Sequence, residues 1–283
     1  VCLDENIKKY QNSECFFWYY GYFKKERKYG NIESTFSLPR VDGKSEVLES
    51  SLILEKIFRA GNGIAAEHKS NLPFVPRAVY SRKLLKRIKK FFGTYIIGPE
   101  PMAGSAQICL ALTDSVVKIN KILTIIEISV DESASNQIQK GSTYEKMMSG
   151  IKVEYVPIKS IRFFPSTSSD VLLKIQKILN LNQYSFNFIK FFSISYFQLL
   201  EFKPNKQLFD EMKTIYYDAF QKLNFLAKIL VKYEILKKTV MPYIDVLLIK
   251  TRFKKSNSWK IISLKNVEID YYNSNKKKLE IYK

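Results

Sequence analysis

Short apolar segments alternate with longer segments of helical spacing over most of the chain from Arg77 onward. Segments of strand length lie at 94–98, 122–129, 152–158 and 185–195. Segments with the 3.6-residue spacing of apolar side chains lie at about 104–118, before Met148, at 168–180 and at 206–220. Strands separated by helices of this length indicate βαβ units and a parallel sheet with right-handed crossovers. We therefore expect an α/β protein, and 283 residues are enough to bury such a core.

The two ends of the chain do not follow this alternation, and no internal repeat is visible. Residues 1–75 are irregular, apart from one amphipathic helix expected at 45–58. Residues 225–238 fit either a buried strand or a helix. Three short apolar segments, at 243–253, 258–265 and 267–272, predict consecutive antiparallel strands. The expected organisation is an N-terminal extension (1–75), a central α/β domain (76–240) and a C-terminal antiparallel strand extension (241–283).

The charge of the chain favours a polyanionic partner. It has 46 Lys and Arg against 27 Asp and Glu, a net charge of +19. Such an excess favours nucleic acid first and an anionic membrane surface second. The chain contains no continuous 18-residue apolar run, so no membrane span is expected.

The strongest basic segment is a predicted amphipathic helix within 77–92. Its apolar side chains have helical spacing, namely Leu84, Leu85, Ile88, Phe91 and Phe92. Its basic residues lie largely outside that stripe, and we predict that they contact RNA: Arg77, Arg82, Lys83, Lys86, Arg87, Lys89 and Lys90. A second basic group, Arg252, Lys254 and Lys255, is a weaker candidate for the same role. For the aromatic cluster Phe16–Phe23, packing in a core or interface is favoured over stacking on bases.

The cysteines and the histidine exclude several kinds of site. Cys2, Cys15 and Cys109 cannot form a paired disulfide framework or supply four thiolates to a structural metal. We expect reduced or buried thiols and no metal site. A Ser/His/Asp or Cys/His catalytic system would depend on His68, the single histidine, which lies in a loop-like segment. Hydrolase chemistry by those routes is not expected.

One turn has the position, although not the composition, of a cofactor-binding loop. It follows the expected strand at 94–98 and reads GPEPMAGSA from Gly98. In open α/β sheets, glycines at such a turn let the backbone approach a ligand at a helix N-terminus. Glu127, at the end of the next expected strand, has the position of an acidic residue that binds a ribose hydroxyl. A Gly and Pro turn is also common in α/β proteins without a ligand.

The order of these segments resembles the methyltransferase-like proteins of the mitochondrial ribosomal small subunit. Glu127-Ile128-Ser129 matches the Glu-x-Ser motif that ends the second strand in that family. Ser195–Glu201, SYFQLLE, loosely resembles its later Ser-Tyr-x-Leu-x-Glu-Leu motif, and Trp259 has the position of a tryptophan-containing turn. The resemblance covers roughly residues 77–283. It implies a Rossmann-like methyltransferase fold and the mitochondrion as the location.

The departures from the family pattern imply that catalysis has been lost. The Asp of the family's first motif aligns with Gly98, its first two glycines align with Glu100 and Met102, and Gly104 alone matches. The family's cluster of metal-binding cysteines is not supplied by the three cysteines of this chain. The resemblance therefore implies a pseudo-methyltransferase without cofactor or small-molecule substrate. It would bind ribosomal RNA and ribosomal proteins as a resident component or an assembly factor.

Two alternatives stay open from the sequence. One is an active AdoMet-dependent RNA methyltransferase with an unusual first motif. The other is a basic scaffold or peripheral membrane protein unrelated to the ribosome.

Overall fold

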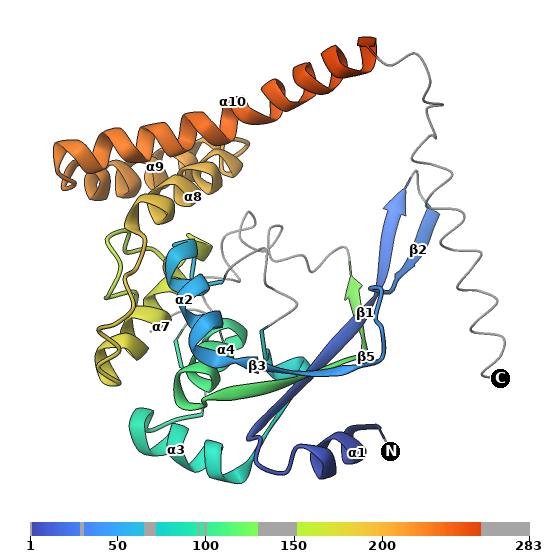
Figure 1. Ribbon diagram of the computed structural model, residues 1–283. Coiled ribbons are helices and arrows are strands. Elements are labelled where there is room, and N and C mark those ends of the chain that lie inside the picture. The colour runs from blue at the N-terminus through green and yellow to red at the C-terminus, as the bar shows by residue number, and fades with distance from the viewer. Residues whose placement is uncertain are drawn as a thin grey trace. The chain divides into compact units, whose positions relative to one another are not determined.

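The computed structural model describes residues 2–28, 31–64, 72–95, 97–98, 101–129 and 152–255, and the side chains of 22–37, 126–129 and 241–255 lie outside the description. The described residues form a mixed α/β structure (Figure 1). The chain divides into two compact units, Val1–Ile235 and Leu236–Lys283. The sheet and most helices belong to the first unit.

The sheet has five strands and mixed pairing. Its strands are β1 (Cys15–Lys28), β2 (Asn31–Ser37), β3 (Ser45–Glu49), β4 (Ala78–Tyr80) and β5 (Ser115–Ser129). The order is β2-β1-β5-β3, and β4 pairs with the start of β1. Only β1 and β5 are parallel among the described strands, with Phe16 opposite Val117; the other pairings are antiparallel. The predicted parallel sheet is therefore reduced to one parallel pair.

Three of these strands come from the part of the chain predicted to be an irregular extension. Because β1 and β3 both pair with β5, residues 1–75 share one sheet with the predicted central domain. The alternation at the start of β1 is hidden because residues 15–17 are buried on both faces of the strand. Phe17 packs into the main core, while Phe16 packs with Val117 and Ile119 against residues of α1 (Cys2–Lys9). A strand buried on both faces has a continuous apolar sequence.

The helices agree with the sequence more closely. They are α2 (Ser50–Ala60), α3 (Arg82–Phe92), α4 (Pro101–Leu112), α7 (Phe164–Ile178), α8 (Phe188–Glu201), α9 (Lys206–Gln221) and α10 (Phe225–Lys255). The helices predicted at 168–180 and 206–220 are confirmed as α7 and α9. The helix predicted at 104–118 ends at Leu112, since β5 begins at Ser115. The helix predicted at 45–58 divides into β3 and α2. The helix predicted before Met148 lies outside the described residues.

The strand predicted at 152–158 is wrong because Asp170 of α7 binds its backbone. One carboxylate oxygen, Asp170 Oδ1, accepts the successive N–H groups of Glu154, Tyr155 and Val156 at 2.8, 2.5 and 3.3 Å. Successive N–H groups of a strand point to opposite sides and cannot converge on one acceptor. Burial raises the pKa of Asp170, and these N–H groups oppose that rise.

Three other predicted strands are also wrong in the described residues. Residues 185–195 enter α8, whose start is capped by Asn187 Oδ1, which accepts the N–H of Lys190 at 3.0 Å. Residues 243–253 continue α10. The described part of 94–98 consists of bends and irregular backbone, and Gly98 has a φ of 74°. The predicted strands at 258–265 and 267–272 lie outside the described residues.

The main core surrounds α4, which is buried along nearly its whole length. Ala103, Ala106, Ile108, Cys109 and Leu110 of α4 belong to the main hydrophobic cluster. The same cluster includes buried side chains of α2, α3, α7 and α8. A helix that is apolar on all sides is typical of such a central position. The core thus fixes the position of α3 against α4.

Candidate nucleic-acid interface

Helix α3 has a defined start, a defined end and one buried face. The Oγ of Ser81 accepts the N–H of Leu84 at 3.0 Å and so caps the N-terminus. Gly93 ends the helix at a φ of 73°, a left-handed conformation that glycine adopts without strain. Leu84 and Ile88, four residues apart, are both buried. They determine which side of α3 faces solvent.

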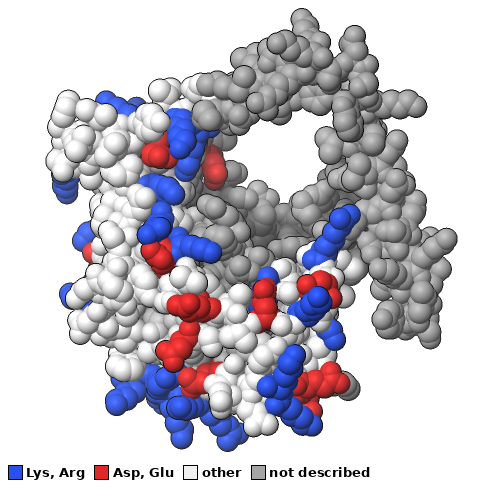
Figure 2. Space-filling model, in the orientation of Figure 1, with Lys and Arg blue, Asp and Glu red and all other residues white. Residues whose placement is uncertain are grey.

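The solvent side of α3 is basic. Its exposed cations are Arg82, Lys83, Lys86, Lys89 and Lys90. At 3.6 residues per turn they form one continuous arc opposite Leu84 and Ile88, and α3 contains no acidic residue. Figure 2 shows Lys and Arg gathered along the lower edge of the molecule, where α3 lies in Figure 1. A surface of one charge sign attracts a polyanion and raises its rate of association.

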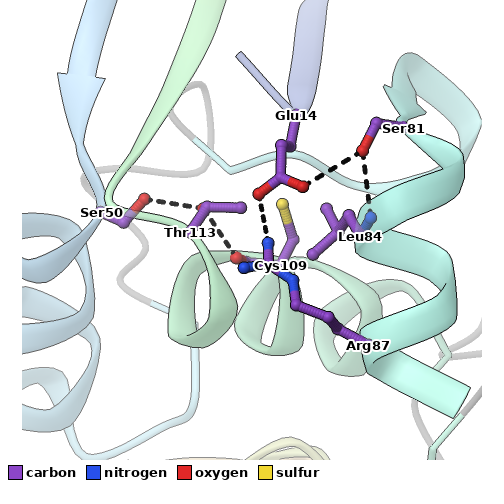
Figure 3. Close-up of polar contacts among 7 residues, drawn as sticks. All are labelled: Glu14, Ser50, Ser81, Leu84, Arg87, Cys109 and Thr113. Atoms are coloured by element: carbon purple, nitrogen blue, oxygen red, sulfur yellow. Dashed lines mark hydrogen bonds and ion pairs between the residues drawn. The ribbon is translucent and has the colours of Figure 1, made fainter. Parts of the chain in front are cut away.

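Glu14, just before β1, ties one edge of this arc to the sheet. Its carboxylate forms an ion pair with Arg87 and lies 3.5 Å from the hydroxyl of Ser81 (Figure 3). The backbone N–H of Ser81 also donates to the carbonyl oxygen of Glu14 at 2.8 Å. Arg87 is therefore occupied by a structural contact. The remaining five cations are exposed to solvent.

The cap of α3 can be tested directly. We expect Ser81→Ala to lower the free energy of unfolding by about 1 kcal/mol, because the N–H of Leu84 loses its acceptor. Ser81→Thr keeps a hydroxyl at this position and should cost at most a few tenths of a kcal/mol. Urea unfolding followed by circular dichroism measures both. Equal stability of the Ala and Thr variants would contradict the assigned cap.

Arg77 does not belong to the interface, and this corrects the prediction from its position in the basic segment. Arg77 is only 3% exposed to solvent. The Nη2 donates to the carbonyl oxygen of Leu72 at 3.1 Å, and the guanidinium lies over the rings of Tyr20 and Phe74, 4.9 and 5.1 Å from their centroids. Arg77 thus stabilises the packing of the segment before α3. The side chains of Arg252, Lys254 and Lys255 lie outside the described residues.

Two exposed aromatic residues near the C-terminal end of α3, Phe91 and Tyr95, were missed from the sequence, and Tyr95 borders the basic arc. Phe91 was predicted to be buried because it lies three residues after Ile88, yet it is 46% exposed. Tyr95, just beyond the Gly93 cap, is 50% exposed, and the Nζ of Lys89 lies 5.7 Å from its ring centroid. An aromatic ring beside basic side chains, as Tyr95 is beside Lys89, is a recurrent platform for unpaired bases. The signal in the sequence was the end of the helix at Gly93, which leaves both rings beyond the last buried turn.

The turn that resembles a cofactor loop is filled by a side chain of α7. A Cβ at Gly98 would overlap the Cγ2 of Val171, and a Cβ at Gly104 would lie 2.6 Å from the carbonyl oxygen of Ile97 and 3.2 Å from the Cγ1 of Val171. Both glycines therefore permit close packing of the chain upon itself. Met102 lies at the start of α4 and is half exposed. Val171 of α7 therefore packs against both described glycines of this turn.

The remaining candidates for the AdoMet site, Glu100 and Glu127, are not described as side chains. Glu100 lies outside the described residues. Glu127 lies near the end of β5, opposite Phe23 of β1, and its side chain is not described. Its predicted role in binding a ribose is therefore untested.

Two of the three described cysteines pack in the core, and Cys2 is partly exposed. Cys15 and Cys109 are fully buried, and burial raises the pKa of the Cys15 thiol. The carbonyl oxygen of Cys109 accepts the hydroxyl of Thr113 at 2.8 Å, and Thr113 in turn contacts Ser50 (Figure 3). His68 lies outside the described residues. Within the described ranges, no group of three or more His, Cys, Asp or Glu could hold a metal ion.

Comparisons with known proteins give no relatives for this chain. No protein-family profile, curated protein or solved structure matches it. Across the part of the chain that is described, no helix has the length and apolar character needed to cross a membrane.

Proposed function

We propose that this protein binds RNA through the basic face of α3 and does not catalyse methyl transfer. The observation that carries the proposal is the arc of five exposed cations on a helix without acidic residues, anchored by Leu84 and Ile88. Neutralisation of phosphates by such side chains releases counterions and supplies affinity that does not depend on sequence.

The dimensions of the arc suit a nucleic-acid backbone. Residues 82–90 span about 12 Å along the helix axis at about 1.5 Å per residue. Phosphates along one strand recur every few ångströms, so α3 can contact several of them at once. Tyr95 lies beside Lys89 at one end of the arc, where a splayed base could stack. This combination favours single-stranded or looped RNA over a uniform duplex.

The ribosomal setting rests on the resemblance to the methyltransferase-like proteins of the mitochondrial small subunit. On that basis we propose ribosomal RNA as the ligand, ribosomal proteins as neighbours and the mitochondrion as the location. A Rossmann-like ancestry belongs to the same proposal. It would require parallel strands beyond the β1–β5 pair, the only parallel pair among the described residues.

The departures from the family's first motif, at Gly98, Glu100 and Met102, support the loss of methyl transfer. Gly104, the one matching glycine, packs closely against Ile97 and Val171, as the last glycine of such a motif can do with or without a ligand. No observation on the described residues favours the active methyltransferase over this reading.

Three measurements test the proposal. In filter binding, the protein should retain transcribed small-subunit rRNA, with an affinity that falls steeply as salt rises. It should also co-sediment with small ribosomal subunits from its own source. Titration calorimetry with AdoMet should give no binding heat. Micromolar AdoMet binding would overturn the non-catalytic proposal. Failure to bind rRNA at low salt would overturn RNA binding.

A further inference from the structure

The outward face of α10 is apolar, although it faces solvent. The helix is started by Asn224, whose Oδ1 accepts the N–H of Ala227 at 2.8 Å. Within the first unit, five large apolar side chains of its first turns are exposed: Phe225 (79%), Leu226 (64%), Ile229 (44%), Leu230 (42%) and Tyr233 (59%). A contiguous group of this kind is unusual on a monomer and marks an interaction site.

The opposite face of the same helix is already packed. Val231 is fully buried, and the half-buried Ile235 packs against the main core. At 3.6 residues per turn, Val231 points away from Ile229 and Tyr233. The helix is therefore apolar on both sides, and the core explains only one of them. The outward face, formed by the exposed apolar side chains of residues 225–233, therefore needs a partner other than this core.

We propose that this outward face docks an amphipathic helix of another protein, one with acidic residues beside its apolar stripe. Leu226, Ile229 and Tyr233 have the a, d, a spacing of a coiled-coil seam. Lys232 is exposed and falls at the flanking g position, and Lys228 follows the same edge. Flanking charges of this kind select partners by forming salt bridges across the seam. A partner with Glu or Asp at its flanking positions complements them.

The charges argue against a second copy of this chain. In an antiparallel pair, Lys232 would face Lys232 of the other copy. In a parallel pair it would face the residue five positions further along, which the sequence shows to be Lys237. The net charge of +19 adds repulsion to either arrangement.

The packing of α10 argues against a membrane surface. A helix that lies in a membrane interface has a strongly charged face opposite its apolar face. In α10 the opposite side contains Val231, Ala227 and Ile235 and faces protein. A helical protein partner is therefore the occupant that the geometry favours.

The test uses the full chain and two fluorescein-labelled synthetic helical peptides of three heptads. Both have Leu at a and d; one has Glu and the other Lys at e and g, and these like charges keep each peptide from pairing with itself. Fluorescence anisotropy at about 0.15 M salt measures binding. We expect the Glu peptide to bind at least about tenfold more tightly than the Lys peptide.

Variants locate the binding. The triple variant Leu226→Gln, Ile229→Gln, Tyr233→Gln keeps the net charge and should weaken binding of the Glu peptide by at least about tenfold. Lys232→Glu should reduce or reverse the preference for the Glu peptide. The matched control, Leu52→Gln with Ile125→Gln, changes exposed apolar residues elsewhere and should bind as the wild type does.

The outcomes separate this inference from RNA binding and from its rivals. Because the changed side chains are exposed, the triple variant should keep its melting temperature and its affinity for rRNA. Peptide binding that survives the triple variant, or that requires the cations of α3 instead, would overturn the proposal. So would the absence of binding to the Glu peptide. Two further results would also overturn it if the triple variant abolished them: a dimer in sedimentation equilibrium, which indicates a second copy, or flotation with phosphatidylserine-containing vesicles, which indicates a membrane.

Discussion

The quadruple variant Arg82→Gln, Lys86→Gln, Lys89→Gln, Lys90→Gln is expected to bind small-subunit rRNA about a hundredfold more weakly at about 0.15 M salt. Each of these cations contributes a counterion-release term of about 0.7 to 0.9 to the slope of log K against log salt. Four of them together account for a slope of about 3. The plot of the variant should therefore be flatter by about that amount. Filter binding over a series of salt concentrations measures both quantities.

A second quadruple variant controls for net charge. Lys203→Gln, Lys206→Gln, Lys213→Gln and Lys222→Gln remove the same charge from exposed positions around α9. If binding depends on the α3 face, this control should retain nearly the wild-type slope. If it loses as much affinity as the α3 variant, the attraction is a property of the whole positive molecule and α3 is not the interface. Both variants change exposed side chains, so their melting temperatures should stay close to that of the wild type.

The choice of those four positions shows what the structure added to the sequence. The helical spacing of Leu84 and Ile88 predicted α3 and its basic side from local pattern alone. Tertiary contacts exclude two of the residues predicted to bind RNA. Arg77 is buried with its guanidinium over the rings of Tyr20 and Phe74, and Arg87 is paired with Glu14. Tyr20 and Glu14 are distant in the sequence from the arginines they contact, so no local pattern could have identified these contacts.

Strands were predicted less well than helices for a related reason. Helices α7 and α9 hold their own hydrogen bonds, so periodicity is enough to find them. Apolar runs such as 185–195 fit a strand or a buried helix equally. Here Asn187 accepts the N–H of Lys190 and so favours the start of helix α8. The segment 152–158 also has the apolar sequence of a strand, but its N–H groups donate to Asp170 of α7 and not to a neighbouring strand. Strand pairing requires a partner whose position the sequence does not reveal.

The turn at 98–104 shows the same limit in the candidate site. The sequence analysis aligned Gly98 with the Asp of the family motif and Gly104 with its one matching glycine. It could not show that Val171 packs against both glycines, since Val171 is more than 60 residues away. Glycines that serve close packing and glycines that serve a ligand look alike in a sequence. A stability measurement distinguishes them.

Gly98→Ala is expected to destabilise the protein by about 2 to 5 kcal/mol. The left-handed φ of 74° at Gly98 costs an alanine about 1 to 2 kcal/mol. The overlap with Val171 adds an overpacking cost of about 1 to 3 kcal/mol. Gly104→Ala has an opposing gain, because alanine favours a helix interior by up to about 1 kcal/mol. The contact of 2.6 Å with the carbonyl oxygen of Ile97 should outweigh that gain and leave a net loss.

Double mutants with Val171→Ala identify the excluding group. The Gly98→Ala, Val171→Ala pair should cost at least about 1 kcal/mol less than the sum of the single changes, because the second change removes the methyl group that the first one meets. The Gly104→Ala, Val171→Ala pair should be close to additive, because its nearest contact is the backbone oxygen of Ile97, which remains. Urea unfolding of the five variants measures these couplings. Near-wild-type stability of both single Ala variants would mean that the turn is open, and a ligand role for its glycines would then return.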